Sequence, residues 1–255
     1  MKMHFLSGGR LQMRKAVYLP TVDRSQTFEL PVISVLLRHP QGNVLFDTGC
    51  HPSVASTADA EARWGALTRV MKPVMAKDDN LVSGLASIGL GTDDIDVVIC
   101  SHLHPDHCGC NAFFKRATLV VHARELDAAR APDAVARGYL ALEWDHPLPI
   151  DAIEGERDVF GDGQIVLIPL VGHTPGTIGA LVRLEHSGSF LLASDTVSLR
   201  ETLDEGIIPR NTWNADALTN SLAEIKRIAA RGATVIYGHD DRQWRTLRKG
   251  AEAYD

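Results

Sequence analysis

Short apolar runs bounded by charged or turn-forming residues alternate with helix-like patterns along most of the chain. Runs of roughly four to eight aliphatic and β-branched residues indicate buried strands. The predicted strands cover residues 31–38, 43–47, 96–100, 117–121, 164–168, 177–184, 189–193 and 233–237. Apolar residues at helical spacing predict helices over residues 79–88, 123–130 and 214–230, the last with Asn214 as its N-cap. Residues 54–76 are predicted to form a helical, partly irregular insertion.

The predicted elements fall into two halves with the same order of parts. Each half has a hairpin and a later strand that ends in a residue able to bind metal. No low-complexity linker separates the halves, so residues 1–255 are predicted to form a single domain. The expected fold class is α/β, with two sheets packed face to face and helices on their outer faces. Loops at the strand ends would then converge on one edge, where a strand-based scaffold carries its active site.

The composition is that of an ordinary globular protein, since 45% of the residues are hydrophobic and 23% are charged. The net charge of −6 gives no basic patch for nucleic acid or for an anionic membrane. The first residues lack the apolar core of a signal peptide, and no run approaches the roughly 18 apolar residues of a membrane span. The four cysteines do not resemble a disulfide framework in a chain of 255 residues. We therefore expect a cytoplasmic protein.

The segment Ser-His-Leu-His-Pro-Asp-His-Cys-Gly, residues 101–109, directly follows one of the predicted strands. It places four side chains able to bind metal on one tight turn: His102, His104, Asp106 and His107. Convergent lone pairs are costly to bury without a cation. Imidazole and carboxylate groups also form the ligand sets of open catalytic metal sites. The segment therefore predicts a metal site.

Three further residues able to bind metal stand at or near the ends of later predicted strands: His173, Asp195 and His239. A single histidine or aspartate in a turn is more often a hydrogen-bonding residue than a metal ligand. Together with the first four they provide the number of ligands that two metals need if a position is to stay open for water. For the pair Cys108 and Cys110 we favour small residues that fill a crowded turn over metal ligands, because a buried free cysteine behaves as a small hydrophobe.

The pattern His102-x-His104-x-Asp106-His107, followed by His173, Asp195 and His239, resembles the signature of the metallo-β-lactamase superfamily. Two further segments match the family's motifs: Asp47-Thr-Gly49 and Gly172-His-Thr-Pro-Gly176. The match runs from about residue 30 to residue 240 and implies a four-layer αβ/βα sandwich. Within the superfamily, the chain length and the complete ligand set resemble the N-acyl-homoserine lactonases and 4-pyridoxolactonase.

The resemblance implies a role for each of these residues. His102, His104 and His173 would hold a first metal ion, and Asp106, His107 and His239 a second. Asp195 would bridge the two. The implied cofactors are two divalent ions, expected to be zinc, although such sites also accept iron, manganese or cobalt. The implied reaction is hydrolysis of a small lactone, most similar to the quorum-quenching reaction, with Asp106 also passing a proton to the departing alkoxide. Asp47 is either a partner of one ligand or a turn cap.

One position departs from the resembled lactonases, which carry a tyrosine three residues after the bridging aspartate. Here that residue is Ser198, whose hydroxyl is too short to reach the same substrate atom directly. Large apolar residues in segments expected near the metal edge are either core or walls of a groove for an acyl or aromatic substrate. The candidate substrate contacts are Ser198, Trp64, Met71, Phe113, Trp144 and Trp213.

Other functions remain open on the sequence. A different bond could be hydrolysed, such as a thioester, a β-lactam or a phosphoester. A glyoxalase II-like thioesterase would need a basic patch near the C-terminus, for which the chain offers Arg242, Arg245, Arg248 and Lys249. A di-iron redox protein would need more carboxylate ligands, and a metal-free binding protein would not retain the full ligand set. The sequence leaves open whether the protein is a monomer or a homodimer.

Overall fold

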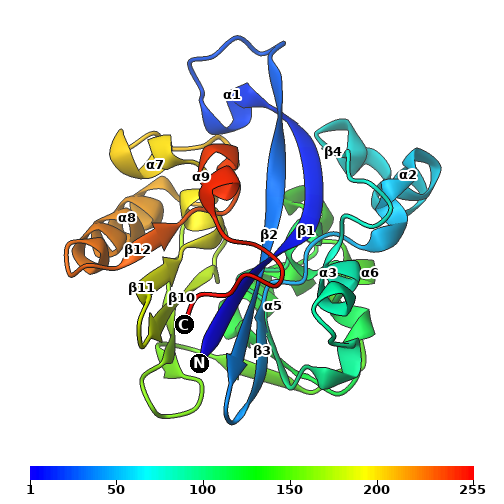
Figure 1. The fold of residues 1–255 in the computed structure, drawn as a ribbon. Coiled ribbons are helices and arrows are strands. Elements are labelled where there is room, and N and C mark those ends of the chain that lie inside the picture. The colour runs from blue at the N-terminus through cyan, green and yellow to red at the C-terminus, as the bar shows by residue number, and fades with distance from the viewer.

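The computed structural model describes residues 1–255 as two β-sheets between outer helices (Figure 1). The first sheet has the strand order β4 (Met71–Pro73), β1 (Lys2–Arg14), β2 (Thr27–His39), β3 (Gly42–Phe46), β5 (Val97–Ile99), β6 (Thr118–His122) and β7 (Ile150–Ile153). The second has the order β12 (Thr234–Ile236), β11 (Gly188–Leu192), β10 (Ile178–Leu184), β9 (Ile165–Pro169) and β8 (Arg157–Asp158). Helices cover the outer faces of both sheets (Figure 1).

The helices are mostly short. The α-helices are α1 (Lys15–Tyr18), α2 (Thr57–Trp64), α3 (Leu81–Ser87), α4 (Pro105–Cys108), α5 (Ala123–Arg130), α6 (Ala141–Trp144), α7 (Arg200–Asp204), α8 (Ala215–Ala229) and α9 (Asp241–Thr246). Single 3-10 turns connect them: η1 (Pro52–Ala55), η2 (Gly65–Arg69), η3 (Thr92–Asp94), η4 (Asn111–Phe113), η5 (Ala134–Arg137) and η6 (Ser194–Val197). None of the helices is both long and apolar enough to cross a bilayer.

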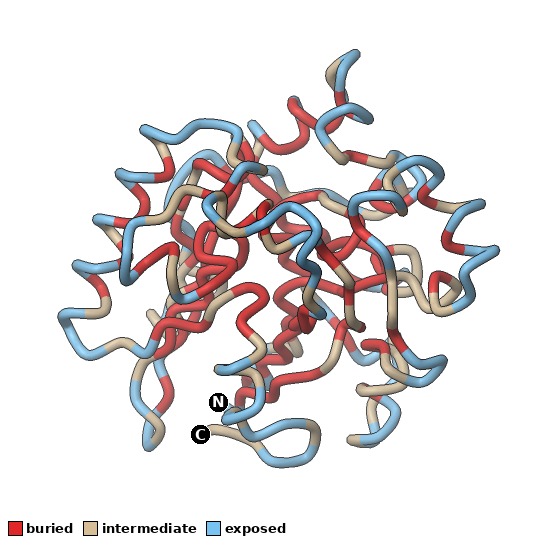
Figure 2. Tube along the Cα trace, turned by 90° about the horizontal axis from the view of Figure 1, so that it is seen from above, coloured by how far each residue is buried: buried red, intermediate tan, exposed pale blue.

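Alternation along the strands explains the layers, because successive side chains of a strand point to opposite faces. In β3, Val44 and Phe46 join the core between the sheets, whereas Leu45 packs with α3 on the outer side. In β11, Leu192 faces the core between the sheets and Leu191 faces α8. Figure 2 shows buried residues concentrated in the middle of the molecule. The expected αβ/βα sandwich is confirmed.

Most predicted elements are confirmed within a few residues, and the helix over residues 123–130 coincides with α5. Asn214 caps α8, since its Oδ1 accepts a hydrogen bond of 2.9 Å from the Ala217 amide. The insertion over residues 54–76 contains α2, two 3-10 turns and the short strand β4. The sequence did not predict β1, the 13-residue strand that pairs with β2 along its length.

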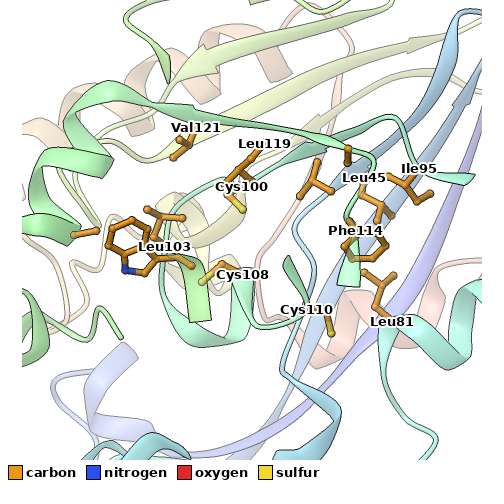
Figure 3. Packing of buried hydrophobic residues seen from close by; sticks show 14 of the residues in the cluster. Leu45, Leu81, Ile95, Cys100, Leu103, Cys108, Cys110, Phe114, Leu119 and Val121 are labelled. Carbon is orange, nitrogen blue, oxygen red and sulfur yellow. The ribbon is translucent and has the colours of Figure 1, made fainter. Parts of the chain in front are cut away.

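The cysteines pack as small apolar residues. All four are free and buried, and three of them lie in the cluster beneath the outer helices of the first sheet (Figure 3). Burial raises the pKa of the Cys108 thiol well above its ordinary value, so this thiol stays protonated. The interpretation of Cys108 and Cys110 as filling residues is confirmed.

Candidate metal centre

The loop after β5 and the short helix α4 form the first part of the site. Pro105 occupies the first turn of α4, where its fixed φ suits the start of a helix and its missing N–H costs nothing. The turn is tied to the end of β3, since the Thr48 amide donates a hydrogen bond of 2.7 Å to the His107 carbonyl. This arrangement directs His102, Asp106 and His107 into the interior, and all three are buried.

The other candidate ligands lie in loops that follow strands of the second sheet. His173 follows β9, Asp195 follows β11 and His239 follows β12. Because β11 and β12 are parallel, and β10 is antiparallel to both β9 and β11, these three residues emerge at one edge of the sheet. The structure therefore brings all seven predicted ligands together, although they are spread over more than 130 residues of sequence.

The seven side chains form overlapping groups. The ligand atoms of His102, His104 and His173 lie within 4.8 Å of one another, as do those of Asp106, His107 and His239. Asp195 lies between these groups. Its Oδ2 is 3.4 Å from His173 Nε2, and its Oδ1 is 2.9 Å from His239 Nε2.

Several of these atoms lack the partners that buried polar atoms require. The Nε2 atoms of His107 and His239 and the Oδ1 atom of Asp195 are buried without a hydrogen bond of acceptable geometry. Nδ1 of His104 lies 3.1 Å from Nε2 of both His102 and His173, so three ring nitrogens meet at one point. Divalent cations between these atoms would satisfy them, so the donor set fits metal ions.

The protonation states of two imidazoles suit ligation, which needs a free lone pair. Burial lowers the pKa of His102 well below its ordinary value and that of His173 to about 3, so both rings are neutral at pH 7. Burial alone would raise the pKa of Asp195, but the neighbouring His239 and His173 hold it well below its usual range. Asp195 is therefore ionised.

The second nitrogen of four candidate imidazoles is fixed by an outer partner, as is usual for metal-binding histidines. His107 Nδ1 lies 2.8 Å from Asp47 Oδ2, and His239 Nδ1 lies 2.8 Å from the Pro31 carbonyl. The other pairs are His102 Nδ1 with Ser101 Oγ at 3.0 Å and His104 Nε2 with the Arg137 carbonyl at 3.0 Å. Each contact leaves the remaining nitrogen directed at the centre.

Backbone strain marks the same edge of both sheets. Asp47 after β3 and Ser194 after β11 are the non-glycine residues with positive φ, at 60° and 48°. Such conformations cost free energy and persist where the surroundings impose them, as at functional sites. Gly238 is constrained in a different way, by space, because a Cβ there would lie 2.6 Å from Asp195 Oδ1. These residues let the chain turn sharply around the metal centre.

Asp47 supports this geometry, and its contacts match the first of the two roles that the sequence left open, a partner of one proposed ligand. Its carboxylate accepts hydrogen bonds of 2.7 Å from the Ser101 amide and the Ser101 hydroxyl, besides its contact with His107.

We expect Asp47→Asn to weaken metal binding about 10- to 100-fold, the usual effect of losing an outer carboxylate. Competition with a chelator would measure this loss. The control is Asp96→Asn, an exposed aspartate that accepts from the Asn43 amide at the other end of β3. Equal metal affinity in both variants would contradict the role of Asp47.

The sequence did not reveal Glu125, a fully buried acid at the start of α5. Its carboxylate accepts hydrogen bonds from the Leu103 amide at 3.0 Å and from the Thr174 hydroxyl at 2.7 Å. Leu103 lies between two candidate ligands and Thr174 follows a third, so Glu125 holds both loops in register. The sequence feature that could have pointed to Glu125 is the presence of an acid on the apolar face of the predicted helix, next to Leu126.

The six candidate substrate contacts differ in burial and in surroundings. Trp64, Met71 and Trp144 are buried in hydrophobic clusters, and Trp64 Nε1 donates a 2.7 Å hydrogen bond to Glu143. Phe113 is half-buried and stacks on His51, and Ser198 is buried. Trp213 is 48% exposed. It lines a cavity of about 480 Å³ together with His104, His173, Arg137, Tyr139 and Arg210.

Comparisons with known proteins agree with this geometry. Residues 28–247 match the family model described as the metallo-beta-lactamase superfamily. The N-acyl homoserine lactonase AttM of Azorhizobium caulinodans is 31% identical, over 100% of this chain and 98% of the relative. AiiB of Agrobacterium fabrum, also an N-acyl homoserine lactonase, is 32% identical over 92% of this chain and 88% of its own.

A solved structure shows the same fold. It is an N-acyl homoserine lactone hydrolase with the product N-hexanoyl-L-homoserine bound at its catalytic metal centre. It matches with a TM-score of 0.89 and 26% identity, over 99% of this chain and 98% of that chain. The resemblance inferred from the histidine and aspartate motifs is thereby confirmed. On its fold, its motifs and the extent of these matches, the chain belongs to the metallo-beta-lactamase superfamily.

Proposed function

We propose that this protein is a dinuclear metal-dependent hydrolase that opens the ring of an N-acyl-homoserine lactone. The observation that carries the proposal is the convergence of five imidazoles and two carboxylates in overlapping groups at one edge of the two sheets. The full-length similarity to lactonases supports the choice of substrate. The four free, buried cysteines support a reducing compartment such as the cytoplasm.

The proposed ligands divide between two ions. His102, His104 and His173 would hold the first and Asp106, His107 and His239 the second, with Asp195 shared. The imidazole-rich set favours zinc, and iron, manganese and cobalt suit the same donors. When bound, the ions would polarise the ester carbonyl and lower the pKa of a water molecule, so that it can act as a nucleophile near neutral pH.

The reaction also requires a side chain to transfer a proton. Water adds to the carbonyl carbon, and the bond from that carbon to the ring oxygen breaks. The departing alkoxide needs a proton, and the water must lose one. Asp106 is the proposed carrier, taking the proton from water and returning it to the ring oxygen. Its Oδ2 lies 3.5 Å from His107 Nε2 and 3.6 Å from His239 Nε2, so it faces the centre where the substrate must bind.

The cavity of about 480 Å³ beside His104 and His173 gives the acyl group a place to lie. Trp213 provides an apolar wall there, and its amide donates a 3.0 Å hydrogen bond to the His173 carbonyl. This bond couples the wall of the cavity to a proposed ligand. Substrate binding and the metal centre are therefore adjacent, as hydrolysis of a bound ester requires.

The basic residues that would favour a glutathione thioesterase contact other residues of the protein. Arg242 pairs with Glu201 at 2.6 Å and Arg245 with Asp241 at 2.7 Å. The Arg248 guanidinium stacks 3.9 Å above the Tyr254 ring, and Lys249 donates to the Trp244 carbonyl at 2.9 Å. Each of the four basic side chains thus has its own partner within the protein, which favours the lactone over the thioester.

Two measurements test the proposal. Elemental analysis of protein purified without chelator should give close to two metal equivalents per chain. A pH-drop assay should show turnover of N-acyl-homoserine lactones in preference to a thioester and a β-lactam. A reproducible single equivalent with full activity would contradict the two-metal assignment. Turnover of the thioester or β-lactam alone would contradict the lactonase assignment.

A further inference from the structure

Ser198 stands where the resembled lactonases carry a tyrosine, but its side chain is not presented to the metal centre. It is 1% exposed, and its hydroxyl lies 3.5 Å from the Asp195 carbonyl oxygen. Its own carbonyl accepts a 2.9 Å hydrogen bond from the His239 amide. Ser198 therefore supports the backbone around two proposed ligands.

Tyr18, the last residue of α1, lies beside the same proposed ligand from the opposite end of the sequence. Its ring lies edge-on to His239, with the ring centroids 6.5 Å apart. It also packs against Phe28 at 5.7 Å and belongs to the same apolar cluster as Leu199, the neighbour of Ser198. The residue is only 3% exposed, so its orientation is fixed by packing.

The Tyr18 hydroxyl has no hydrogen-bond partner in the protein, and it is not among the polar atoms sealed away from solvent. Burial, together with Asp195 and Asp106, raises the pKa of Tyr18 well above its ordinary value, so the phenol stays protonated. A phenol is protonated at neutral pH even at its ordinary pKa of about 10. Tyr18 thus has a free donor on a ring that lies beside His239, one of the proposed ligands.

The segment that carries Tyr18 is anchored to the wall of the substrate cavity. The Arg210 amide donates to the Val17 carbonyl at 2.7 Å, and the Arg210 guanidinium donates to the Pro20 carbonyl at 2.9 Å. Arg210 itself lines the cavity beside His104 and His173. These two hydrogen bonds tie the segment around α1 to a residue that lines the cavity.

We propose that the Tyr18 hydroxyl donates a hydrogen bond to the carbonyl oxygen of the bound lactone, and so replaces from α1 the tyrosine that position 198 lacks. The inference rests on the proposed lactonase function. The bond strengthens as the carbonyl oxygen gains negative charge, so it contributes more to kcat than to substrate binding.

Tyr18→Phe is the decisive variant, because it removes one oxygen and keeps the packed ring. The control is Tyr254→Phe, whose hydroxyl accepts from the Arg248 amide near the C-terminus, away from the ligands. For N-hexanoyl-homoserine lactone we expect kcat/KM of Tyr18→Phe to fall about 10- to 100-fold, mostly through kcat. Tyr254→Phe should stay within about threefold of the unaltered protein. Metal content and thermal midpoint should be unchanged in both.

Binding of the ring-opened product provides a second readout. Titration calorimetry with N-hexanoyl-L-homoserine should show weaker binding to Tyr18→Phe than to Tyr254→Phe. A Tyr18→Phe variant with unchanged kcat/KM and product affinity would overturn the proposal, as would activity lost only in proportion to metal. If the unaltered protein neither hydrolyses the lactone nor binds the product, the lactonase function itself fails and the role of Tyr18 fails with it.

Discussion

Asp106→Asn is expected to lose about 10²- to 10⁴-fold in kcat on a homoserine lactone while it retains most of its metal. The range is the usual contribution of a positioned acid or base. An amide has nearly the same shape as a carboxylate and can coordinate weakly, but it cannot take a proton from water and return it to the ring oxygen. Asp106 is buried beside His107 and His239, so no solvent molecule replaces it easily. Steady-state kinetics and metal analysis on the same preparation measure the two effects.

Asp127→Asn is a matched control, since Asp127 is an exposed aspartate of α5. It should leave both kcat and metal content unchanged. A substrate with a better leaving group should also recover much of the rate in Asp106→Asn, because a phenoxide departs without a proton. Near-normal turnover of the lactone by Asp106→Asn would assign the proton transfer to another group.

Asp195→Ala is expected to have the largest effect on the metals themselves. Asp195 lies 3.4 Å from His173 Nε2, 2.9 Å from His239 Nε2 and 3.7 Å from His107 Nε2, and so contacts both groups of ligands. Removing one partner from a buried charged site costs about 3–5 kcal/mol, which corresponds to metal binding weaker by roughly 10²- to 10³-fold or more. Elemental analysis after dialysis should therefore show fewer than two equivalents, with activity lost in parallel.

Asp204→Ala, at an exposed aspartate of α7, controls for loss of an acid nearby in the sequence. Asp195→Asn separates charge from packing, because the amide fills the same space. It should bind metal better than Asp195→Ala but worse than the unaltered protein. Two tightly bound equivalents in Asp195→Ala would show that the groups hold their ions independently and that Asp195 does not bridge them.

The fold class followed from the sequence because each half keeps its apolar residues in short, β-branched runs bounded by turn residues, which favour buried strands over helices. The strand β1 was missed for a physical reason. Its alternation is broken by Ser7-Gly8-Gly9, a combination that normally indicates a turn. In the structure a bulge lies between Ser7 and Gly9, and a Cβ at Gly8 would lie 2.7 Å from the Gly49 Cα. The glycines are needed for that close approach of two backbones, which local sequence does not reveal.

The sequence by itself determined which residues are the candidates for the chemistry, because His102 to His107 are neighbours on one turn and their spacing is a local property. Only the tertiary structure decided their supports and surroundings. Glu125 joins loops around residues 103 and 174, and Tyr18 meets His239 across more than 200 residues. Trp64 lies in the core, where Glu143, distant in sequence, accepts its indole N–H. Burial and hydrogen-bond partners depend on which distant segments pack together, and periodicity along the chain carries no record of that pairing.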